Sequence, residues 1–290
     1  MSNVSQVYKR VHELQQRYLR LRMGKDALLK VIYESEVAEQ VYNSNAIENS
    51  TLSLEETDKI LRQINLDRFI EERELFEAKN LARVVEYTAV KASQEELSLD
   101  MMLLLHKMLI SNIRDDIAGR LRNPDEWVRV GSHIAADPKD LLKLIQDMFV
   151  TYQASTQENI IKRIARFHLT FEHIHPFVDG NGRIGRVLNN YLLIRENHVP
   201  INIKFIDRGL YYDAFEEFDS KQRTTLMEGI VGKALCSSYH KRLAYLEGKT
   251  IVSLAEYAKR EGVSHSNLLN KANRQTIEAF WERGVWKIGF

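Results

Sequence analysis

The sequence predicts a mainly α-helical protein with one short β-hairpin and a small C-terminal module of the winged helix-turn-helix type. Three observations lead to this prediction. Only four prolines and 13 glycines interrupt a 290-residue chain that is rich in helix-forming side chains. Apolar residues recur at spacings of three and four in several segments, which is the period of a helix. The stretch over residues 122–138 departs from that period and carries a proline near each end.

Composition and charge exclude several classes of protein. With 44% hydrophobic and 28% charged residues, the chain has the composition of a globular protein, and its length allows about two domains. The net charge of +1 gives no overall attraction to nucleic acids or membranes. Cys236 has no cysteine partner, which fits a reducing setting. The N-terminus lacks an apolar signal core, and no apolar run approaches the ~20 residues that span a bilayer. We therefore expect a cytoplasmic protein with no membrane partner.

Capping signals mark where two of the predicted helices begin. Ser53 and Glu56 have the spacing of a capping box ahead of a helical stretch. Asp137 and Pro138 supply an N-cap and a proline at the first helical position. We therefore expect helices after both pairs.

The stretch RNPDEWVRVGSHIAADP, residues 122–138, lies between helical segments. Its β-prone side chains flank a Gly-Ser pair, which is typical of a short β-hairpin or an extended flap. The residues concerned are Trp127, Val128, Val130, Gly131, Ser132 and Ile134.

Two amphipathic helices enclose the most unusual segment of the chain, HPFVDGNGRIGR, which runs from His175 to Arg186. The apolar face of the helix before it comprises Ile160, Ile164, Phe167, Phe171 and Ile174. The apolar face of the helix after it comprises Ile184, Val187, Leu188, Tyr191 and Leu192. The segment is therefore predicted to be a loop that leads into a helix.

The composition changes near residues 246–250, and the tail reads as a separate small module. Ala258, Gly262, Val263 and Leu268 occupy the small-residue, turn and two core positions of a helix-turn-helix. Trp286 and Ile288 are predicted to lie on a closing wing strand. The exposed face of the second helix is expected to carry His265, Ser266, Asn267, Lys271 and Arg274.

The loop has the side chains and backbone of a phosphate site. Glycines on either side of Asn181 let successive amides point into one concavity, and the free amides of the following helix also favour anions. Arg183 and Arg186 are three residues apart, so both guanidinium groups can face the same site. Asp179 is placed to hold a magnesium ion, and His175 can exchange a proton near neutral pH. These parts suit transfer of a phosphorus group from a nucleotide to a hydroxyl.

Zinc is the alternative to this interpretation, because His168, His173 and His175 lie close together in the sequence. A catalytic zinc site usually needs three well-spaced protein ligands, and neither an H-E-x-x-H pattern nor a cysteine pair is present. His168 also lies beside the apolar face and is expected to be a hydrogen-bonded core residue. We therefore do not expect these three histidines to bind zinc together.

The segment matches the Fic-domain signature H-P-F-x-D-G-N-G-R-x-x-R at every specified position, and the resemblance covers about residues 35–240. Fic proteins are helical apart from a flap, and they typically transfer AMP from ATP to a Ser, Thr or Tyr hydroxyl with release of pyrophosphate. The resemblance implies that His175 is the general base, that Phe177 fixes the loop and that Asp179 binds magnesium. It implies that nucleotide phosphates are held by Gly180, Asn181, Gly182, Arg183, Arg186 and Asn190, with Arg186 at the γ-phosphate.

Two further segments resemble parts of Fic proteins. Ser44 and Glu48, followed by Asn49, match the S/T-x-x-x-E-G/N motif of an inhibitory helix, expected over about residues 35–50. The resemblance implies that Glu48 pairs with Arg186. The stretch GRLRNPDEWVRVGS resembles the flap that docks the target, which assigns this role to Val128, Val130 and Gly131. The implied organisation is a helical region over 1–95, a catalytic core over 96–245 and a winged-helix module over 246–290.

The expected partners are ATP and a hydroxyl-bearing target protein, which includes the chain itself. The tail resembles the winged modules of bacterial Fic proteins, so DNA is a candidate partner, and protein docking or homo-oligomerisation is an equal alternative. The alternative function is a DNA-binding regulator whose Fic core senses nucleotide with little transferase activity. Transfer of a different nucleotide-derived group is a third hypothesis.

Overall fold

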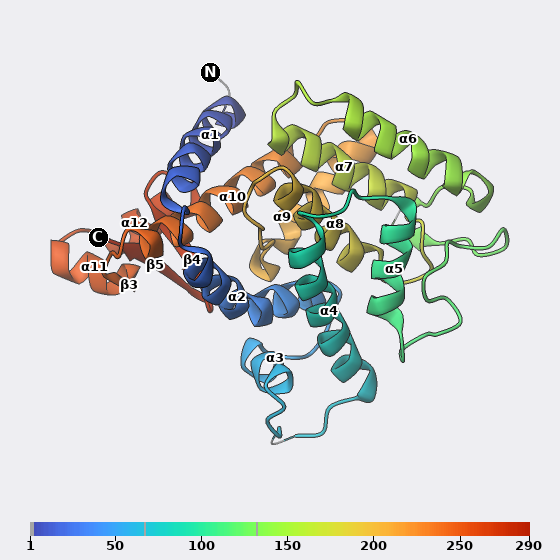
Figure 1. Ribbon diagram of the computed structural model, residues 1–290, viewed down its shortest axis with the longest axis horizontal. Coiled ribbons are helices and arrows are strands. Elements are labelled where there is room, and N and C mark those ends of the chain that lie inside the picture. Colours follow the sequence, from blue (N-terminus) through green and yellow to red (C-terminus); the bar gives the residue numbers. More distant parts are fainter. Residues whose placement is uncertain (1–2, 67, 132) are drawn as a thin grey trace.

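The computed structural model describes residues 3–66, 68–131 and 133–290, and it confirms the predicted mainly helical fold (Figure 1). The α-helices are α1 (Asn3–Leu21), α2 (Asp26–Ile47), α3 (Leu54–Leu61), α4 (Glu72–Lys91), α5 (Leu99–Ile110), α6 (Leu141–Ala154), α7 (Ile160–Ile174), α8 (Asn181–Arg195), α9 (Arg208–Lys221), α10 (Thr225–Leu246), α11 (Leu254–Glu261) and α12 (His265–Asn273). The strands are β1 (Arg129–Val130), β2 (His133–Ile134), β3 (Ile251–Ser253), β4 (Ala279–Glu282) and β5 (Val285–Gly289). Two short 3-10 helices are η1 (Pro138–Asp140) and η2 (Phe205–Asp207).

One hydrophobic core joins the helices from α1 to α10. In Figure 1, α7, α8 and α10 lie at the centre, and α10 packs against both α1 and α7. Helix α8 packs against α7 on one side and against α4 on the other. The core extends from Val11 to Leu246 and includes the fully buried Phe171, Phe177 and Tyr191. The loop between α7 and α8 is therefore anchored in the centre of the molecule.

Both predicted helix starts are confirmed, and the second begins with a 3-10 turn. The Ser53 hydroxyl accepts a hydrogen bond from the Glu56 amide, and the Glu56 carboxylate accepts one from the Ser53 amide, so the capping box opens α3. The Asp137 side chain caps η1 by accepting from the Lys139 amide. The α-helix that follows, α6, begins only at Leu141, because the first turn after Pro138 is a 3-10 turn.

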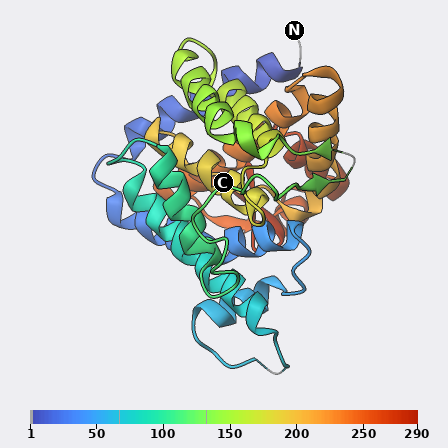
Figure 2. The same cartoon turned by 90° about the vertical axis from the view of Figure 1, so that its right-hand side faces the viewer.

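The predicted hairpin is present and short. Strands β1 and β2 are antiparallel, Val130 pairs with His133, and the Ala135 amide donates to the Val128 carbonyl over 3.0 Å. Gly131, with φ of 59°, supplies the left-handed turn, whereas Ser132 lies outside the described residues. Figure 2 shows the two strands as green arrows on the face toward the viewer. Val130 and Ile134 are largely exposed, so the hairpin presents apolar side chains to solvent.

The C-terminal segment has a small hydrophobic cluster of its own. Strands β3, β5 and β4 form an antiparallel sheet in that order, and α11 and α12 are joined by a turn at Gly262. Trp286 and Ile288 lie on β5 and are buried, as are Ala258 and Leu268. Val263 is 46% exposed, so its predicted core position is wrong: the turn directs this side chain to solvent.

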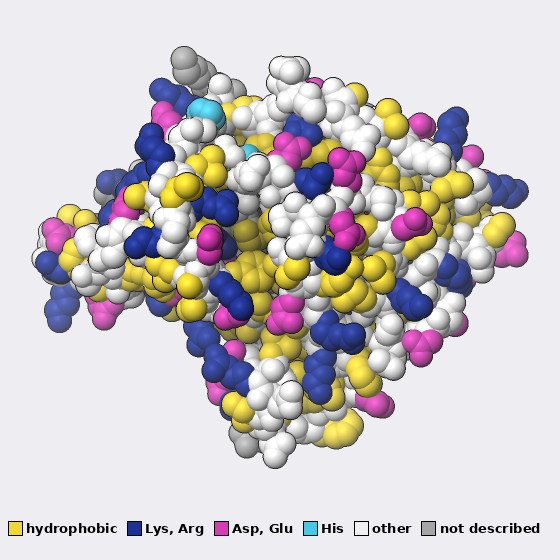
Figure 3. Space-filling view, viewed as in Figure 1, with side chains coloured by type: hydrophobic (Ala, Val, Ile, Leu, Met, Phe, Trp, Pro, Cys, Tyr) yellow, Lys and Arg dark blue, Asp and Glu magenta, His cyan; other side chains and the backbone are white. Residues whose placement is uncertain are grey.

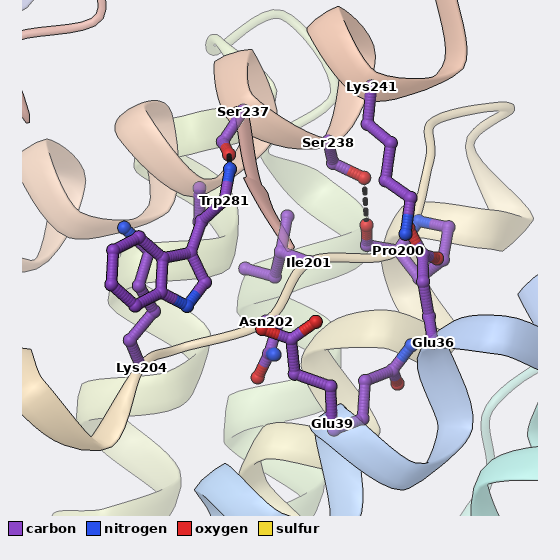
Figure 4. A pocket seen from close by; sticks show the side chains of 12 residues that line it. Glu36, Glu39, Pro200, Ile201, Asn202, Lys204, Ser237, Ser238, Lys241 and Trp281 are labelled. Atoms are coloured by element: carbon purple, nitrogen blue, oxygen red, sulfur yellow. Dashed lines mark hydrogen bonds and ion pairs between the residues drawn. The ribbon is translucent and has the colours of Figure 1, made fainter. Parts of the chain in front are cut away.

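Buried ion pairs connect this segment to α10 and α2. The Lys241 ammonium on α10 lies 2.8 Å from Glu282 on β4 and 3.3 Å from Glu36 on α2, and its side chain is 4% exposed. Arg242 pairs with Glu36 at 2.7 Å. Figure 4 shows the small pocket at this junction, where Lys241 and Glu36 approach each other beside the side chain of Glu39. Helix α2 therefore contacts the C-terminal segment through charged groups that have little access to water.

The N-terminal helix contributes a second connection. Arg17 on α1 pairs with Glu247 at the end of α10 and with Glu278 just before β4. The Glu39 carboxylate on α2 accepts a hydrogen bond from the Arg283 amide in the turn between β4 and β5. Within the residues that the structure describes, no helix is both long and apolar enough to cross a bilayer.

Candidate active site

The loop between α7 and α8 is held by its own backbone and by one amide side chain. His175 caps α7 in a left-handed conformation, φ 50°, and its amide donates to the Phe171 carbonyl over 2.9 Å. Gly180, with φ of 84°, caps the start of α8. The Asn181 side chain accepts from the Phe177 amide and donates to the Phe177 carbonyl, each over 2.9 Å. Asn181 thereby closes the loop with its side chain, which leaves its backbone amide at the first turn of α8.

A buried histidine that the sequence analysis missed supports the loop from beneath. His106 on α5 stacks on Phe177 with ring centroids 3.7 Å apart. Its Nδ1 accepts from the Gly119 amide over 3.0 Å, so its Nε2–H donates to the Asp179 carbonyl over 3.1 Å. Burial lowers the pKa of His106 to about 4, which keeps the ring neutral in this arrangement. Nothing local in the sequence indicates this role, because α5 precedes the loop by about 70 residues.

His175 is positioned as a neutral imidazole. Its side chain is 14% exposed, and its Nδ1 lies 3.3 Å from the Glu172 carbonyl, which can only accept a hydrogen bond. Nδ1 therefore carries the proton and Nε2 has the lone pair. Burial lowers the pKa of His175 to about 4. Arg122 fixes the backbone here by donating from its side chain to the His175 carbonyl over 2.8 Å and from its amide to the Pro176 carbonyl.

Asp179 and Arg183 form a charged pair at the other end of the loop. Arg183 lies 3.1 Å from Asp179 and 3.1 Å from Glu77, and Arg73 on α4 lies 2.9 Å from Asp179. Burial would raise the pKa of Asp179, but the two guanidinium groups outweigh burial and hold that pKa below its usual value. The carboxylate is therefore ionised at neutral pH and is a suitable oxygen ligand for a hard cation.

Arg186 contacts the end of α2, where the resemblance places its partner Glu48. Its Nη2 donates to Glu48 Oε1 over 2.8 Å and to the Ser44 carbonyl over 2.8 Å, while its Nε donates to the Ser44 hydroxyl over 2.9 Å. Nη1 lies 3.3 Å from the Tyr211 hydroxyl. Burial by itself would lower the pKa of Arg186, yet Tyr211 and Glu48 outweigh burial and hold the pKa above its usual value. The guanidinium is charged, and each of its three nitrogens contacts at least one of these oxygens.

The residues around Glu48 make this contact sterically possible. Asn49 has φ of 70°, a left-handed conformation that glycine and asparagine tolerate best, and it terminates α2. This geometry explains why an asparagine directly after Glu48 suits the site. Gly182 lies so near the Glu48 carboxylate that a side chain at this position would collide with it. The Tyr212 hydroxyl also donates to the Ile47 carbonyl over 3.0 Å and fixes the last turn of α2.

Glu172 is a second group that the sequence analysis missed. It lies one turn before His175 with its side chain 10% exposed, and burial raises its pKa to about 8, against the opposing effect of Arg186. Its carboxylate lies 3.8 Å from His175 Nδ1 and next to Gly185, which leaves no space for a larger residue there. The sequence does contain a signal for this residue, because it places an acidic side chain three residues before the motif histidine in a predicted helix.

The remaining predicted residues lie apart from the loop. Asn190 donates to and accepts from the backbone of Ile201, over 3.0 and 2.8 Å, so its amide is committed to that segment. Val128, Val130 and Gly131 lie on the hairpin.

The three histidines of the zinc alternative do not converge. His168 Nε2 contacts the Tyr211 hydroxyl at 2.7 Å, and His173 Nδ1 contacts Asp219 at 2.8 Å. His175 has its own contact with the backbone of Glu172. Each ring has a different partner, which agrees with the expectation that they do not share a metal.

Comparison with known proteins identifies the family of this domain. The model of the Fic/DOC family matches residues 96–193. A protein adenylyltransferase Fic from Nematostella vectensis is 31% identical over 181 residues, 60% of this chain and 42% of that protein. The corresponding protein from Aedes aegypti is 30% identical over 217 residues, 70% of this chain and 43% of that protein. The chain thus spans less than half the length of these curated relatives.

Solved structures support the same fold. A structure of Fic-1 from C. elegans has a TM-score of 0.73 at 23% identity and covers 84% of this chain and 73% of that one. A Fic family protein from Desulfovibrio desulfuricans has a TM-score of 0.69 at 20% identity and covers 100% and 96%. Residues 96–193, with the loop from His175 to Arg186 between α7 and α8, are therefore a Fic/DOC family domain.

Proposed function

We propose that the chain is a protein adenylyltransferase that moves AMP from ATP to a Ser, Thr or Tyr hydroxyl of a target protein or of itself. The observation that carries this proposal is a neutral His175, with the lone pair on Nε2, at the head of the loop whose amides and arginines suit a triphosphate. The relatives named protein adenylyltransferase Fic support it, although each is more than twice as long as the matched region.

The proposed reaction is a single in-line displacement. The target hydroxyl oxygen bonds to the α-phosphorus of ATP, the bond from that phosphorus to the bridging oxygen breaks, and pyrophosphate leaves. The proton of the hydroxyl passes to His175 Nε2, which is free because Nδ1 is bonded to the Glu172 carbonyl. Amides at Gly180, Asn181 and Gly182 and the Arg183 side chain would stabilise the phosphate charge at the start of α8.

Asp179 is the residue that would hold magnesium. Its carboxylate is ionised and 28% exposed, which fits a cation that keeps several waters and binds through one carboxylate and the phosphates. When bound, magnesium would neutralise charge on the phosphate oxygens. Arg183 and Arg73 neutralise Asp179 in this state, so both side chains would have to release it.

The chain is further proposed to belong to the class with an N-terminal inhibitory helix. Support comes from Arg186, whose guanidinium is bound by Ser44 and Glu48 of α2 and is therefore not free for a γ-phosphate. ATP would then bind in a pose whose α-phosphorus is turned away from the hydroxyl. In-line transfer is sensitive to such a misplacement, and an error of about 1 Å can cost roughly a hundredfold in rate.

The organisation proposed from the sequence is a helical region over 1–95, a catalytic core over 96–245 and a winged-helix module over 246–290. The separate cluster around Leu268 supports the last boundary. On the face drawn in Figure 3, basic and acidic side chains alternate over this module, which favours protein docking or self-association over DNA binding. Asn190 is proposed to act through the Ile201 segment that it holds. We further propose that the protein acts in the cytoplasm.

The test is incubation of the full chain with ATP labelled at the α-phosphate and with magnesium. We expect the protein to gain label and the mass of one adenylyl group, more strongly as the Glu48→Gly variant. His175→Ala in the same background should reduce transfer by about 10² to 10⁴ while ATP binding persists, because a general base acts on the hydroxyl and not on the phosphates. No added mass would favour a nucleotide sensor, and a different added mass would indicate another transferred group.

A further inference from the structure

Three possible metal ligands meet beside the active site, from elements that are distant in the sequence. His133 lies on the hairpin strand β2, His173 in the last turn of α7, and Asp219 on α9. Their donor atoms all lie within 4.8 Å of one another. His173 Nδ1 is 2.8 Å from Asp219 Oδ1, and His133 Nδ1 is 3.8 Å from Asp219 Oδ2. The two imidazole rings are tilted against each other with centroids 4.3 Å apart.

The hydrogen bonds of His133 determine which of its nitrogens is available. His133 Nε2 lies 2.9 Å from the backbone carbonyl of His173, and a carbonyl oxygen only accepts, so Nε2 carries a hydrogen. The lone pair of a neutral His133 is therefore on Nδ1, which faces the Asp219 carboxylate. Two acceptors that face each other repel unless a cation lies between them. A ring N–H donated to a backbone carbonyl is also the usual arrangement of a histidine that binds a metal through its other nitrogen.

We propose that His133, His173 and Asp219 form a zinc-binding site. Zinc lies about 2.0–2.2 Å from nitrogen and carboxylate ligands, so two ligand atoms on one ion are at most about 4 Å apart. The separations of 2.8 and 3.8 Å meet this limit, and because no pair of donor atoms is more than 4.8 Å apart, a closure of less than about 1 Å would bring every pair within it. Two imidazoles and one carboxylate are a ligand set that suits zinc, with the fourth position left for water.

Such a site would fasten the hairpin to the catalytic domain. His133 belongs to the hairpin strand, whereas His173 and Asp219 belong to helices of the core, and His173 is two residues from His175. A metal bond across this junction would restrict the hairpin where it contacts the end of α7, two residues before His175. Zinc would then control the access of a target segment to the hairpin. This role does not depend on which group the domain transfers.

The primary test is zinc binding by the full, untagged chain after removal of metals with EDTA. Isothermal titration with Zn²⁺ should give one site per chain, and titration with Co²⁺ should give its visible absorption bands. His133→Ala and Asp219→Asn should each weaken the Kd at least tenfold. His265→Ala, which removes an exposed histidine from α12, should leave the Kd unchanged. Circular dichroism before titration would show that each variant is folded.

Two outcomes would overturn the proposal. If the wild-type chain binds no more zinc than His133→Ala, the three residues form only a hydrogen-bonded cluster of histidine and aspartate side chains. If zinc is lost on Asp179→Asn but not on His133→Ala, the ion occupies the active-site carboxylate instead.

A second readout reports on the hairpin itself. Arg129 on β1 is exposed, so trypsin should cut after it, and zinc should slow this cut at least several-fold. Cleavage after Arg68, an exposed residue between α3 and α4, provides the internal reference and should not change. In Asp219→Asn, zinc should protect neither position. Protection of Arg129 that persists in Asp219→Asn would contradict a metal bond through that carboxylate.

Discussion

Arg186 is the residue on which the proposed control depends, because a single helix supplies three of the oxygens that hold it. Ser44 contributes a hydroxyl and a carbonyl, and Glu48 contributes the only charged oxygen of the three. The charged contact neutralises the guanidinium, whereas the two contacts from Ser44 mainly orient it. A change of Glu48 alone should therefore remove the charge neutralisation of Arg186 and leave the two Ser44 contacts that orient it.

Glu48→Gly should raise automodification strongly, by about tenfold to a hundredfold, because it frees the guanidinium to orient the nucleotide. Glu48→Asp should raise it less, since a charge remains near Arg186. The measurement is the initial rate of labelled AMP incorporation at equal ATP.

The matched control is the double variant Glu48→Gly with Arg186→Ala. It should lose the gain, because the released arginine is what orients the triphosphate. A rate for Glu48→Gly equal to that of the wild type would mean that the pairing with Arg186 has no part in control.

Among the individual residues, the sequence predicts those that are contiguous in the active-site loop, but it does not predict the distant residues that contact them. The segment from His175 to Arg186 is recognisable because its groups are adjacent in the chain. His106 and Tyr211 reach the site from α5 and α9, and no local pattern marks them, since only the packing of those helices brings them there. Glu172 was within reach of sequence reasoning, because its position on α7 follows from the helical period.

Among the elements, the hairpin offers an edge that suits an extended target segment. Its strands are only two residues long, and Trp127, Val130 and Ile134 are exposed along it. Main-chain pairing with an added strand would provide affinity without a specific side-chain pattern.

Val128→Pro should reduce target modification several-fold while the Kd for ATP stays within about twofold. Proline removes the amide donor of residue 128 but retains the carbonyl that accepts from Ala135, so the hairpin should persist. Rates with a target protein and nucleotide titrations, measured on the same preparation, check this prediction. Parallel loss of both activities would instead indicate misfolding around the hairpin.

Prediction from sequence succeeds for elements whose signal is local. The apolar periods of α7 and α8 and the capping box of α3 suffice to define these helices. Helix α2 is longer than the inhibitory segment expected over residues 35–50, because it begins at Asp26 and packs against α4 and α8. Its apolar residues are spread around the helix, so periodicity alone gives little indication of its length.

For the molecule as a whole, burial of histidines makes stability depend on pH. Burial lowers the pKa of five histidines to about 3–4, compared with 6.5 when they are exposed. Between pH 6.5 and 4 the unfolded chain therefore binds more protons at these positions than the native chain does. Stability from this source is present above pH 6.5 and is lost as the pH falls. The five are His106, His168, His175, His198 and His240.

The midpoint of thermal unfolding should fall clearly between pH 7 and pH 5. Each histidine contributes a slope of up to about 1.4 kcal/mol per pH unit. Glu172 and Glu39 stabilise the fold as the pH falls, because burial raises their pKa values. The five histidines outnumber these two glutamates, so we expect a net loss of stability. Calorimetry at several pH values measures the slope, which should be smaller in His198→Gln. A midpoint that is unchanged or higher at pH 5 would contradict this account.

Removal of residues 248–290 tests how the parts of the chain depend on each other. The C-terminal cluster is separate from the main core, so the truncated chain should keep a cooperative transition and bind ATP. Its midpoint should be lower, because Arg17 loses Glu278 and Lys241 loses Glu282. Helix α2 also loses the bond from the Arg283 amide to Glu39, so automodification should rise. Calorimetry and labelled AMP measure the two effects.

The matched control for the truncation is Lys241→Met in the full chain. It removes the ion pairs to Glu36 and Glu282 and keeps the fold of the C-terminal segment. It should raise automodification less than the truncation does. If the truncated chain shows no cooperative transition, residues 248–290 are part of the catalytic core.

The exposure of Glu48 determines how fast its contact with Arg186 can break and re-form. Glu48 is 38% exposed, while Ser44 is buried one turn earlier in α2. The carboxylate can therefore turn into solvent while the helix and its two Ser44 contacts stay in place. Exposed side chains change rotamer within picoseconds to nanoseconds, whereas a helix needs microseconds or longer to shift. The Arg186 guanidinium thus loses its charged partner in brief intervals without any rearrangement of the fold, while Ser44 keeps it oriented.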